Sequence, residues 1–328
     1  MKHLIAGDIG GTKCNLGWYV WDGTLRQVRQ ATYPSRAYAN FDDLLDEFVR
    51  DGDGGAASAL ALGVAGPVRE GVCRTTNLPW QLSAYALAER HGIPRVRLLN
   101  DLEATALGML QLPPGDWVTL NPDAIERPGT IAVIAAGTGL GEAILAWDGR
   151  RHLALATEGG HCDFAPRSDR DDALLRWLRL RFPHHVSVER ILAGPGIALI
   201  YQYLCESHGV PAANCVTSGD GADLSARISH CALHEADPVC NETLRWFIQL
   251  YGAEAGNLAL KSLAVGGVYV GGGIAPKLRR LFDEGGFMEA FVAKGRFAGL
   301  LREIDVRLCL NPDTALLGAA YAAVELLD

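Results

Sequence analysis

Apolar and polar positions in the first third of the chain alternate between the two-residue period of strands and the longer period of helices. The stretch HLIAGDIGGTKCNLGWYV (3–20) predicts two strands joined by a glycine-rich turn, with Asp8 where the first strand ends. Further predicted elements are a helix at 41–50 with Asn40 as N-cap, a buried strand before Gly66-Pro67, a helix from Ser83 to Gly92, a strand at 95–99 and a helix after Asn100-Asp101. This alternation is typical of an α/β fold.

The pattern restarts after a turn-rich break at 112–117, which we interpret as a boundary between two lobes. Residues 130–147 again predict strand, glycine turn and strand, the plan of the opening segment. A third apolar strand ends in glycines at 271–273, and a helix rich in small residues is expected at 312–327. The shared plan of the two strand–turn–strand units is the pattern that an internal duplication would leave.

Composition narrows the class of protein. The chain has 328 residues, 49% of them apolar, which favours about two domains. A net charge of −8 argues against a nucleic-acid surface, and no apolar run is long enough to predict a membrane span. The first residues enter a strand without a signal-peptide pattern, so a cytoplasmic location is expected. The eight cysteines show no paired spacing, so we expect free thiols and no zinc site.

Two of the glycine turns carry residues suited to binding phosphate. Thr12 and Thr138 add hydroxyls to turns whose backbone N–H groups can face phosphate oxygens. Glycine there allows positive φ or a close approach to another group. Neither turn has the spacing of a P-loop or of the dinucleotide fingerprint, and each alone is weak evidence. Asp8 is either an acid that faces a metal ion or a hairpin acid satisfied by local N–H groups.

Six segments taken together resemble the bacterial glucokinase family, within the hexokinase–actin–Hsp70 ATPase superfamily. They are GDIGGTK (7–13), LLNDLEATALG (98–108), AAGTGLG (135–141), EGGHCDFAP (158–166), SVERILAGPGI (187–197) and GGVYVGGGIAP (266–276). The cysteine-rich zinc motif of the related ROK sugar kinases is absent from this sequence. The resemblance implies an α/β, two-lobed actin-like ATPase (ribonuclease H-like) fold with an active-site cleft between the lobes. The small lobe would be 1–111 joined by 312–328, and the large lobe 112–311.

The resemblance also implies roles for individual residues. ATP is expected to contact three glycine segments: Gly7, Asp8, Ile9, Gly10, Gly11 and Thr12; Gly137, Thr138, Gly139 and Gly141; Gly272 and Gly273. Asp8 is expected to hold Mg²⁺ through water. Asp101 is expected to be the catalytic base, and the sugar is expected to bind Asn100, Asp101, Glu158, His161 and Glu189. Taken alone, Asn100 or Asp101 could be a helix N-cap, and Glu189 could be a first-turn acid. Asn77 and Trp80 are weaker candidates for the sugar site.

The activity implied is that of an ATP-dependent glucokinase that forms glucose 6-phosphate, with glucose and Mg-ATP as partners and a homodimer as the expected assembly. A kinase for another hexose is the nearest alternative. A catalytically silent sugar sensor is disfavoured because Asp8 and Asp101 are both present. An actin-like or Hsp70-like ATPase module would give no reason for EGGH together with SVER.

Overall fold

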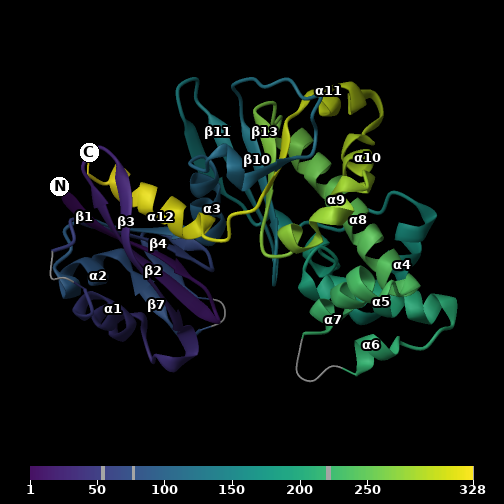
Figure 1. The fold of residues 1–328 in the computed structure, drawn as a ribbon, viewed down its shortest axis with the longest axis horizontal. Coiled ribbons are helices and arrows are strands. Elements are labelled where there is room, and N and C mark those ends of the chain that lie inside the picture. Colours follow the sequence, from purple (N-terminus) through teal and green to yellow (C-terminus); the bar gives the residue numbers. More distant parts are fainter. Residues whose placement is uncertain (53–55, 76–77, 219–222, 328) are drawn as a thin grey trace. The chain divides into compact units, whose positions relative to one another are not determined.

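The computed structural model describes residues 1–52, 56–75, 78–218 and 223–327 (Figure 1). The chain folds into two compact units. The first unit consists of Met1–Asp116, Ala154–Ala156 and Asn311–Asp328, and the second of Trp117–Leu153 and Thr157–Leu310. Among the described residues, no helix combines the length and the apolar character needed to cross a membrane.

The first unit is built on a five-stranded sheet with the order β3-β2-β1-β4-β8. Its strands are β1 (Lys2–Ile9), β2 (Lys13–Trp21), β3 (Leu25–Pro34), β4 (Ala59–Val64) and β8 (Val96–Asn100), with a small sheet of β5 (Val68–Arg69), β6 (Val72–Arg74) and β7 (Gln81–Ser83). Its helices are η1 (Ser35–Ala37), α1 (Phe41–Arg50), α2 (Ala84–His91), α3 (Asp101–Met109), η2 (Pro114–Asp116) and α12 (Thr314–Glu325).

Helices cover both faces of this sheet. Side chains alternate along β1, so Leu4 and Ala6 pack with alanines of α12, whereas Ile5 and Ile9 pack with Phe48 of α1 in a separate cluster. Figure 1 shows α3 and α12 on one side of the sheet and α1 and α2 on the other. The C-terminal helix therefore completes the core of the unit that contains the N-terminus.

Helices α3 and α12 cross at backbone contact. A Cβ atom at Gly108 would overlap the carbonyl oxygen of Thr314, and one at Gly318 would overlap the carbonyl oxygen of Ala104. Two glycines are therefore required at this crossing, which fixes the helix that begins at Asp101.

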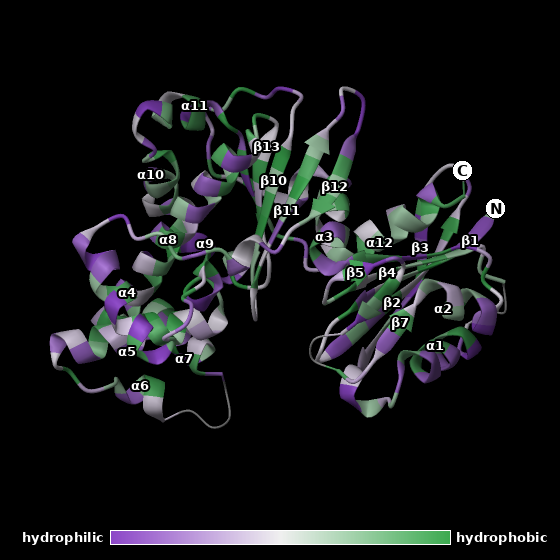
Figure 2. Ribbon diagram, turned by 180° about the vertical axis from the view of Figure 1, so that it is seen from behind, coloured by the Kyte–Doolittle hydropathy of each residue, from purple (hydrophilic) through white to green (hydrophobic). Residues whose placement is uncertain are grey.

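The second unit contains a six-stranded sheet with the order β12-β11-β10-β13-β14-β9, except for the last three residues of β12, which belong to the first unit. Its strands are β9 (Trp117–Thr119), β10 (Ile131–Ala136), β11 (Leu140–Trp147), β12 (His152–Ala156), β13 (Gly267–Gly271) and β14 (Val306–Cys309). Its helices are η3 (Gly159–His161), α4 (Asp169–Arg181), η4 (Val188–Arg190), α5 (Gly194–His208), α6 (Asn214–Thr217), α7 (Leu224–His230), the π-helix η5 (Cys231–Glu235), α8 (Pro238–Ser262), η6 (Ala275–Leu278), α9 (Arg279–Asp283), α10 (Gly286–Val292), η7 (Gly295–Phe297) and α11 (Ala298–Glu303). Figure 2 shows the hydrophobic character of β10, β11 and β13.

The two large sheets share one plan, as the sequence pattern predicts. In each, an antiparallel hairpin (β1 with β2, or β10 with β11) continues into two parallel strands (β4 and β8, or β13 and β14). The predicted helix ends are also confirmed: Asn40 accepts a hydrogen bond from the Asp43 amide, and Gly92 ends α2 with φ of 63°.

The expectation that all cysteines are free thiols is wrong for this structure. Cys215 and Cys231 form a disulfide, while six cysteines are free. The two partners come from α6 and η5, sixteen residues apart, so no short spacing motif could reveal the pair.

Candidate active site

Asp8 is a half-buried residue near the end of β1 and lies opposite Asn15 of β2. Its Oδ2 accepts a hydrogen bond of 3.2 Å from the Asn15 side-chain amide, and Thr32 Oγ1 donates to the other end of that amide at 2.8 Å. Burial raises the pKa of Asp8, while the Asn15 hydrogen bond and the Lys13 charge oppose the rise. The carboxylate thus has one amide partner in the hairpin, and a cation beside it would stabilise the ionised form.

The glycines around Asp8 serve close packing. Gly7, Gly10 and Gly11 are not among the glycines with positive φ, so that part of the expectation is wrong. A Cβ atom at Gly7 would lie 2.5 Å from Leu62 Cδ2, and one at Gly10 would lie 3.0 Å from the Lys13 carbonyl oxygen. Close neighbours therefore limit the space for a side chain at Gly7 in β1 and at Gly10 in the turn.

Asp8 and Asp101 lie at the same end of the first sheet. The parallel register aligns Asp8 with Gly63, and Gly63 with Leu99, so Asp8 near the end of β1 and Asp101 directly after β8 lie at the carboxyl ends of the two parallel strands that flank β4. Ligand sites of open α/β sheets lie at this end. A Cβ atom at Gly63 would lie 3.7 Å from the Gly7 carbonyl oxygen and 3.8 Å from Asp101 Cα, so this glycine separates the two segments.

Asn100 is the N-cap of α3, which confirms the interpretation that the sequence left open. Its Oδ1 accepts from the Leu102 amide at 2.9 Å, and its Nδ2 donates to the Gly66 carbonyl oxygen at 3.3 Å. Asp101 Oδ1 accepts from the same Leu102 amide at 2.9 Å, which orients the carboxyl group. Because both ends of the Asn100 amide bind the protein, its contact with sugar stays a prediction.

In the second unit, three glycine segments meet through backbone hydrogen bonds. Within the second turn, the Gly137 amide donates a hydrogen bond to the Gly139 carbonyl, and the Gly137 carbonyl accepts one from the Gly194 amide, each at 2.8 Å. The carbonyl of Ala136, just before this turn, accepts from Ile274 at 3.2 Å. Gly272 has φ of +82°, which favours glycine at this position. The structure therefore brings the segment 271–274 beside the turn 137–141.

Glu158, His161 and Glu189 lie on two adjacent segments of the same unit. Glu158 is the exposed N-cap residue of η3, His161 is its exposed last residue, and Glu189 is half-buried in η4. Backbone hydrogen bonds join the two segments: the Phe164 amide donates to the Val186 carbonyl at 3.0 Å, and the Val188 amide donates to the Cys162 carbonyl at 2.9 Å. Glu189 Oε2 accepts from the Leu140 amide at 3.0 Å, which connects this cluster to the glycine turn.

The residues predicted from the sequence to form the site are divided between the two units. The first unit holds Gly7–Thr12, Asn100 and Asp101, and the second holds Gly137, Thr138, Gly139, Gly141, Gly272, Gly273, Glu158, His161 and Glu189. Asn77 lies outside the described residues. Trp80 is buried against Phe41 in the core of the first unit, where it serves packing.

Sequence analysis missed a cavity beside Thr138. It has a volume of about 730 Å³ and is lined by Thr138, Glu189 and mostly apolar side chains of α5, α6 and α7. Such a mainly apolar hollow with a few polar groups is typical of a small-molecule site. No motif marks it, since its lining residues follow the ordinary pattern of amphipathic helices.

Sequence analysis also missed Glu142, a buried acid behind the turn η3. Its side chain is 2% exposed, and among the described residues Oε1 has no hydrogen-bond partner. Burial, with a contribution from Glu254, raises the pKa of Glu142 to about 7, against the opposing charge of Lys261. A Cβ atom at Gly159 would overlap the Glu142 carboxyl group, so the turn that carries Glu158 packs directly on this acid. The only sequence signal is an acid within the apolar strand pattern GLGEAIL.

The stability of the protein is expected to depend on the protonation of Glu142. Its folded-state pKa lies above the unfolded value of 4.5, so this contribution is complete below pH 4.5 and is lost as pH rises through 7. Glu142→Gln, which mimics the neutral acid, should gain up to about 3 kcal/mol relative to wild type between pH 4.5 and 8. Denaturant unfolding of both proteins across this range, with the exposed Glu89→Gln as control, measures the difference. Parallel pH curves for wild type and Glu142→Gln would contradict the assignment.

Comparison with known proteins agrees with this arrangement. A family model described as Glucokinase matches residues 5–326. The glucokinase of Synechocystis sp. is 36% identical, covering 98% of this chain and 98% of that protein. The crystal structure of a glucokinase from an Antarctic psychrotroph superposes with a TM-score of 0.87 at 29% identity, covering 99% of both chains. A ROK family glucokinase from Streptomyces griseus, in complex with glucose and AMPPNP, shares the fold with a TM-score of 0.67 at 20% identity, covering 98% of this chain and 99% of that one.

Proposed function

The chain belongs to the glucokinase family, and from this premise we propose that it transfers the γ-phosphoryl group of ATP to the 6-hydroxyl of glucose with Asp101 as general base. The fold is the two-lobed α/β fold of sugar kinases. We assign the small lobe to the first unit and the large lobe to the second, close to the boundaries expected from the sequence. The homodimer and the cytoplasmic location stay predictions.

The hydrogen bond from the Leu140 amide to Glu189 Oε2 carries this proposal. It joins a sugar candidate to a turn suited to phosphate, within one unit. Phosphoryl transfer depends mainly on positioning the acceptor hydroxyl against the phosphate. A direct link between the two binding segments supplies that positioning.

Asp101 is suited to accept the proton of the 6-hydroxyl. Its Oδ1 is held by the Leu102 amide at the first turn of α3, where the helix dipole favours a carboxylate. The helix itself is fixed by its crossing with α12. The base therefore has a defined orientation, as proton transfer in the transition state requires.

Glu158, His161 and Glu189 are suited to bind the ring hydroxyls of glucose. Carboxylates accept hydrogen bonds from hydroxyl groups, and the imidazole donates or accepts. One oxygen of Glu189 is engaged by Leu140, so the sugar would use the other. Asn100 is better suited to hold the start of α3 than to contact sugar.

We assign the phosphates of ATP to the turns 7–12 and 137–141, whose glycines and threonines suit phosphate binding, and the nucleoside to the cavity beside Thr138. Gly272 and Gly273, next to the second turn, complete the predicted nucleotide contacts. Asp8 is a fitting partner for a hydrated Mg²⁺, because it is a partly buried carboxylate whose ionised form gains from a nearby cation. The ion would neutralise charge on the phosphates.

The proposal is tested by glucose-dependent ADP release with and without Mg²⁺, in wild type, Asp8→Ala and Asp8→Asn. Asn at position 8 can still accept the hydrogen bond from Asn15, so it separates the charge from the hairpin contact. We expect both variants to lose roughly tenfold or more in kcat/KM for Mg-ATP, because each removes the charge. Glucose binding without nucleotide should survive in Asp8→Asn.

If Asp8→Asn keeps the wild-type magnesium dependence and turnover while Asp8→Ala loses stability, Asp8 is a structural acid of the hairpin. Absence of glucose-dependent ADP release in wild type would contradict the whole proposal.

A further inference from the structure

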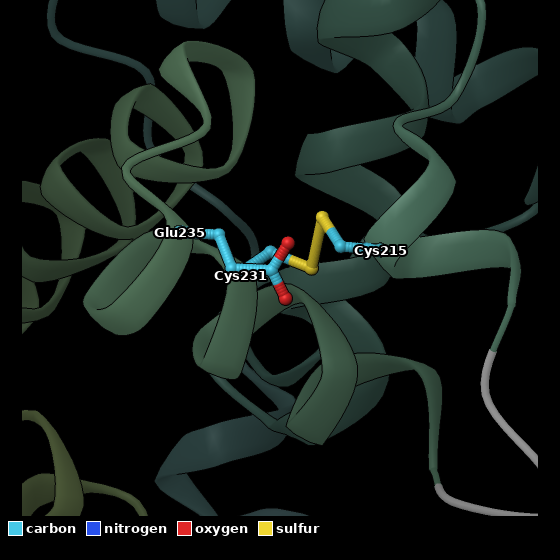
Figure 3. Close-up of side chains that lie close together, drawn as sticks. All are labelled: Cys215, Cys231 and Glu235. Atoms are coloured by element: carbon cyan, nitrogen blue, oxygen red, sulfur yellow. A yellow bond between two sulfur atoms is a disulfide. The ribbon is translucent and has the colours of Figure 1, made fainter.

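The disulfide between Cys215 and Cys231 lies outside the residues assigned so far. The two Cα atoms are 6.0 Å apart, a separation typical of disulfides. Figure 3 shows the bridge between α6 and the start of η5, with the carboxyl group of Glu235 beside it. Cys231 is buried, whereas Cys215 is half-buried, so an external thiol or disulfide reaches the pair through Cys215.

The bridge ties together one wall of the cavity beside Thr138. Helix α6 contributes Val216 and Thr217 to the lining, and α7, enclosed between the two cysteines, contributes Leu224 and Arg227. A link between Cys215 and Cys231 therefore restricts helices α6 and α7, which carry these four lining residues.

Hydrogen bonds connect this wall to the phosphate turn. Ser225 Oγ of α7 donates to the Gly194 carbonyl oxygen at 2.5 Å, and the Gly194 amide donates to the Gly137 carbonyl oxygen at 2.8 Å. Tyr201 Oη accepts from the Ala213 amide at 2.8 Å, which holds the start of α6 against α5. These hydrogen bonds therefore connect the mobility of α6 and α7 to the turn 137–141.

We propose that Cys215 and Cys231 form a reversible redox site that sets the affinity for ATP. In the disulfide form the wall is pre-organised, and in the dithiol form α6 and α7 must be ordered when the nucleoside binds, which costs affinity. The proposal rests on the assignment of the nucleoside to this cavity. Glucose affinity, which depends on Glu158, His161 and Glu189, should respond little.

The chemistry balances with glutathione disulfide as oxidant. The Cys215 thiolate attacks one sulfur of glutathione disulfide, forms a mixed disulfide and releases one glutathione thiolate. The Cys231 thiolate then attacks the Cys215 sulfur and releases the second. Two protein thiols are oxidised to one disulfide, one glutathione disulfide is reduced to two thiols, and the two protons pass to the released thiolates.

The alternative role for the two cysteine sulfurs is to bind a metal ion together with a nearby carboxylate. One ligand atom each from Cys215, Cys231 and Glu235 lie within 4.8 Å of one another, and two thiolates with a carboxylate are a ligand set that suits Zn²⁺. The disulfide removes both thiolates, so the two uses exclude each other. The structure contains the disulfide, which favours the redox site.

The test equilibrates the full-length protein in glutathione buffers of graded ratio. Alkylation and mass spectrometry count the Cys215–Cys231 disulfide, while KM is measured for ATP and for glucose at each ratio. We expect KM for ATP to fall about three- to tenfold as the disulfide forms, with KM for glucose changing less than about twofold. Cys215→Ser with Cys231→Ser should match the reduced protein at every ratio, whereas Cys162→Ser, which removes an exposed thiol, should keep the response.

Three results would overturn the proposal: a pair that stays reduced at every ratio, one tightly bound zinc per reduced chain, or a KM for ATP that does not follow the disulfide. Ala198→Trp, which fills the cavity, tests the nucleoside assignment separately. If Ala198→Trp raises KM for ATP and the redox state does not change it, only the redox site fails. If neither changes it, the nucleoside assignment fails.

Discussion

Asp101→Asn is expected to lower kcat by at least about 100-fold, while KM for glucose changes far less. Asparagine keeps the size of the side chain and an oxygen that can accept the hydrogen bond from the Leu102 amide. It cannot accept the proton of the 6-hydroxyl. The loss should therefore appear in turnover, and the fold should be retained because Asn100 still caps α3.

The matched control for this variant is Glu103→Gln, the same chemical change in the same helical turn. Glu103 pairs with Arg97 at 2.9 Å, so its loss removes only a partly exposed ion pair. The test compares kcat and KM of both variants by steady-state kinetics, with thermal unfolding to verify that both are folded. If Asp101→Asn retained most of its turnover, the base would be another group.

Most elements could be predicted from the sequence because their signals are local. Asn40 caps α1 through an amide three residues away, and Gly92 ends α2 by its own backbone conformation. The hairpin of β1 and β2 likewise follows from apolar strands around a glycine turn. Such features depend on neighbours in the sequence, so a pattern can reveal them.

The reasons for several glycines could not be predicted. The sequence suggested freedom of φ in the first turn, but Gly7 has a negative or extended φ and lies against the side chain of Leu62 on another strand. Gly160 similarly leaves no room for a side chain against the carbonyl of Leu140. Close approach is a property of tertiary packing, which a single sequence does not display.

The same limit applies to Glu142 and to the cysteine pair. A carboxyl group is expensive to bury alone, so sequence analysis places acids on the surface or in a motif. Glu142 on β11 is buried because Gly159 of the turn η3 packs directly on its carboxyl group, a contact between segments distant in the sequence. Cys215 and Cys231 meet because α6 packs against α7 and η5.

Besides the loss of turnover in Asp101→Asn, we expect a large difference in kcat/KM between glucose and the other sugars. Glu158, His161 and Glu189 together can bond several ring hydroxyls, and a sugar that misplaces one leaves a polar group unpaired. That penalty is about 1–3 kcal/mol for a neutral group and more for a charged one. Glucose should therefore exceed mannose, galactose and fructose by roughly tenfold or more in kcat/KM.

Glu158→Gln and Glu189→Gln should each lower kcat/KM for glucose by roughly tenfold, mainly through KM, and narrow its advantage over the other sugars. Glu189→Gln should in addition raise KM for ATP, because Glu189 Oε2 also accepts the Leu140 amide of the glycine turn, whereas Glu158→Gln should not. Measuring kcat/KM for the four sugars and KM for ATP in all three proteins tests both statements. If wild type used glucose and mannose with equal kcat/KM, the proposed contacts with the ring hydroxyls would be wrong. A change in KM for ATP in both variants, or in neither, would mean that the bond between Leu140 and Glu189 does not couple the two binding segments.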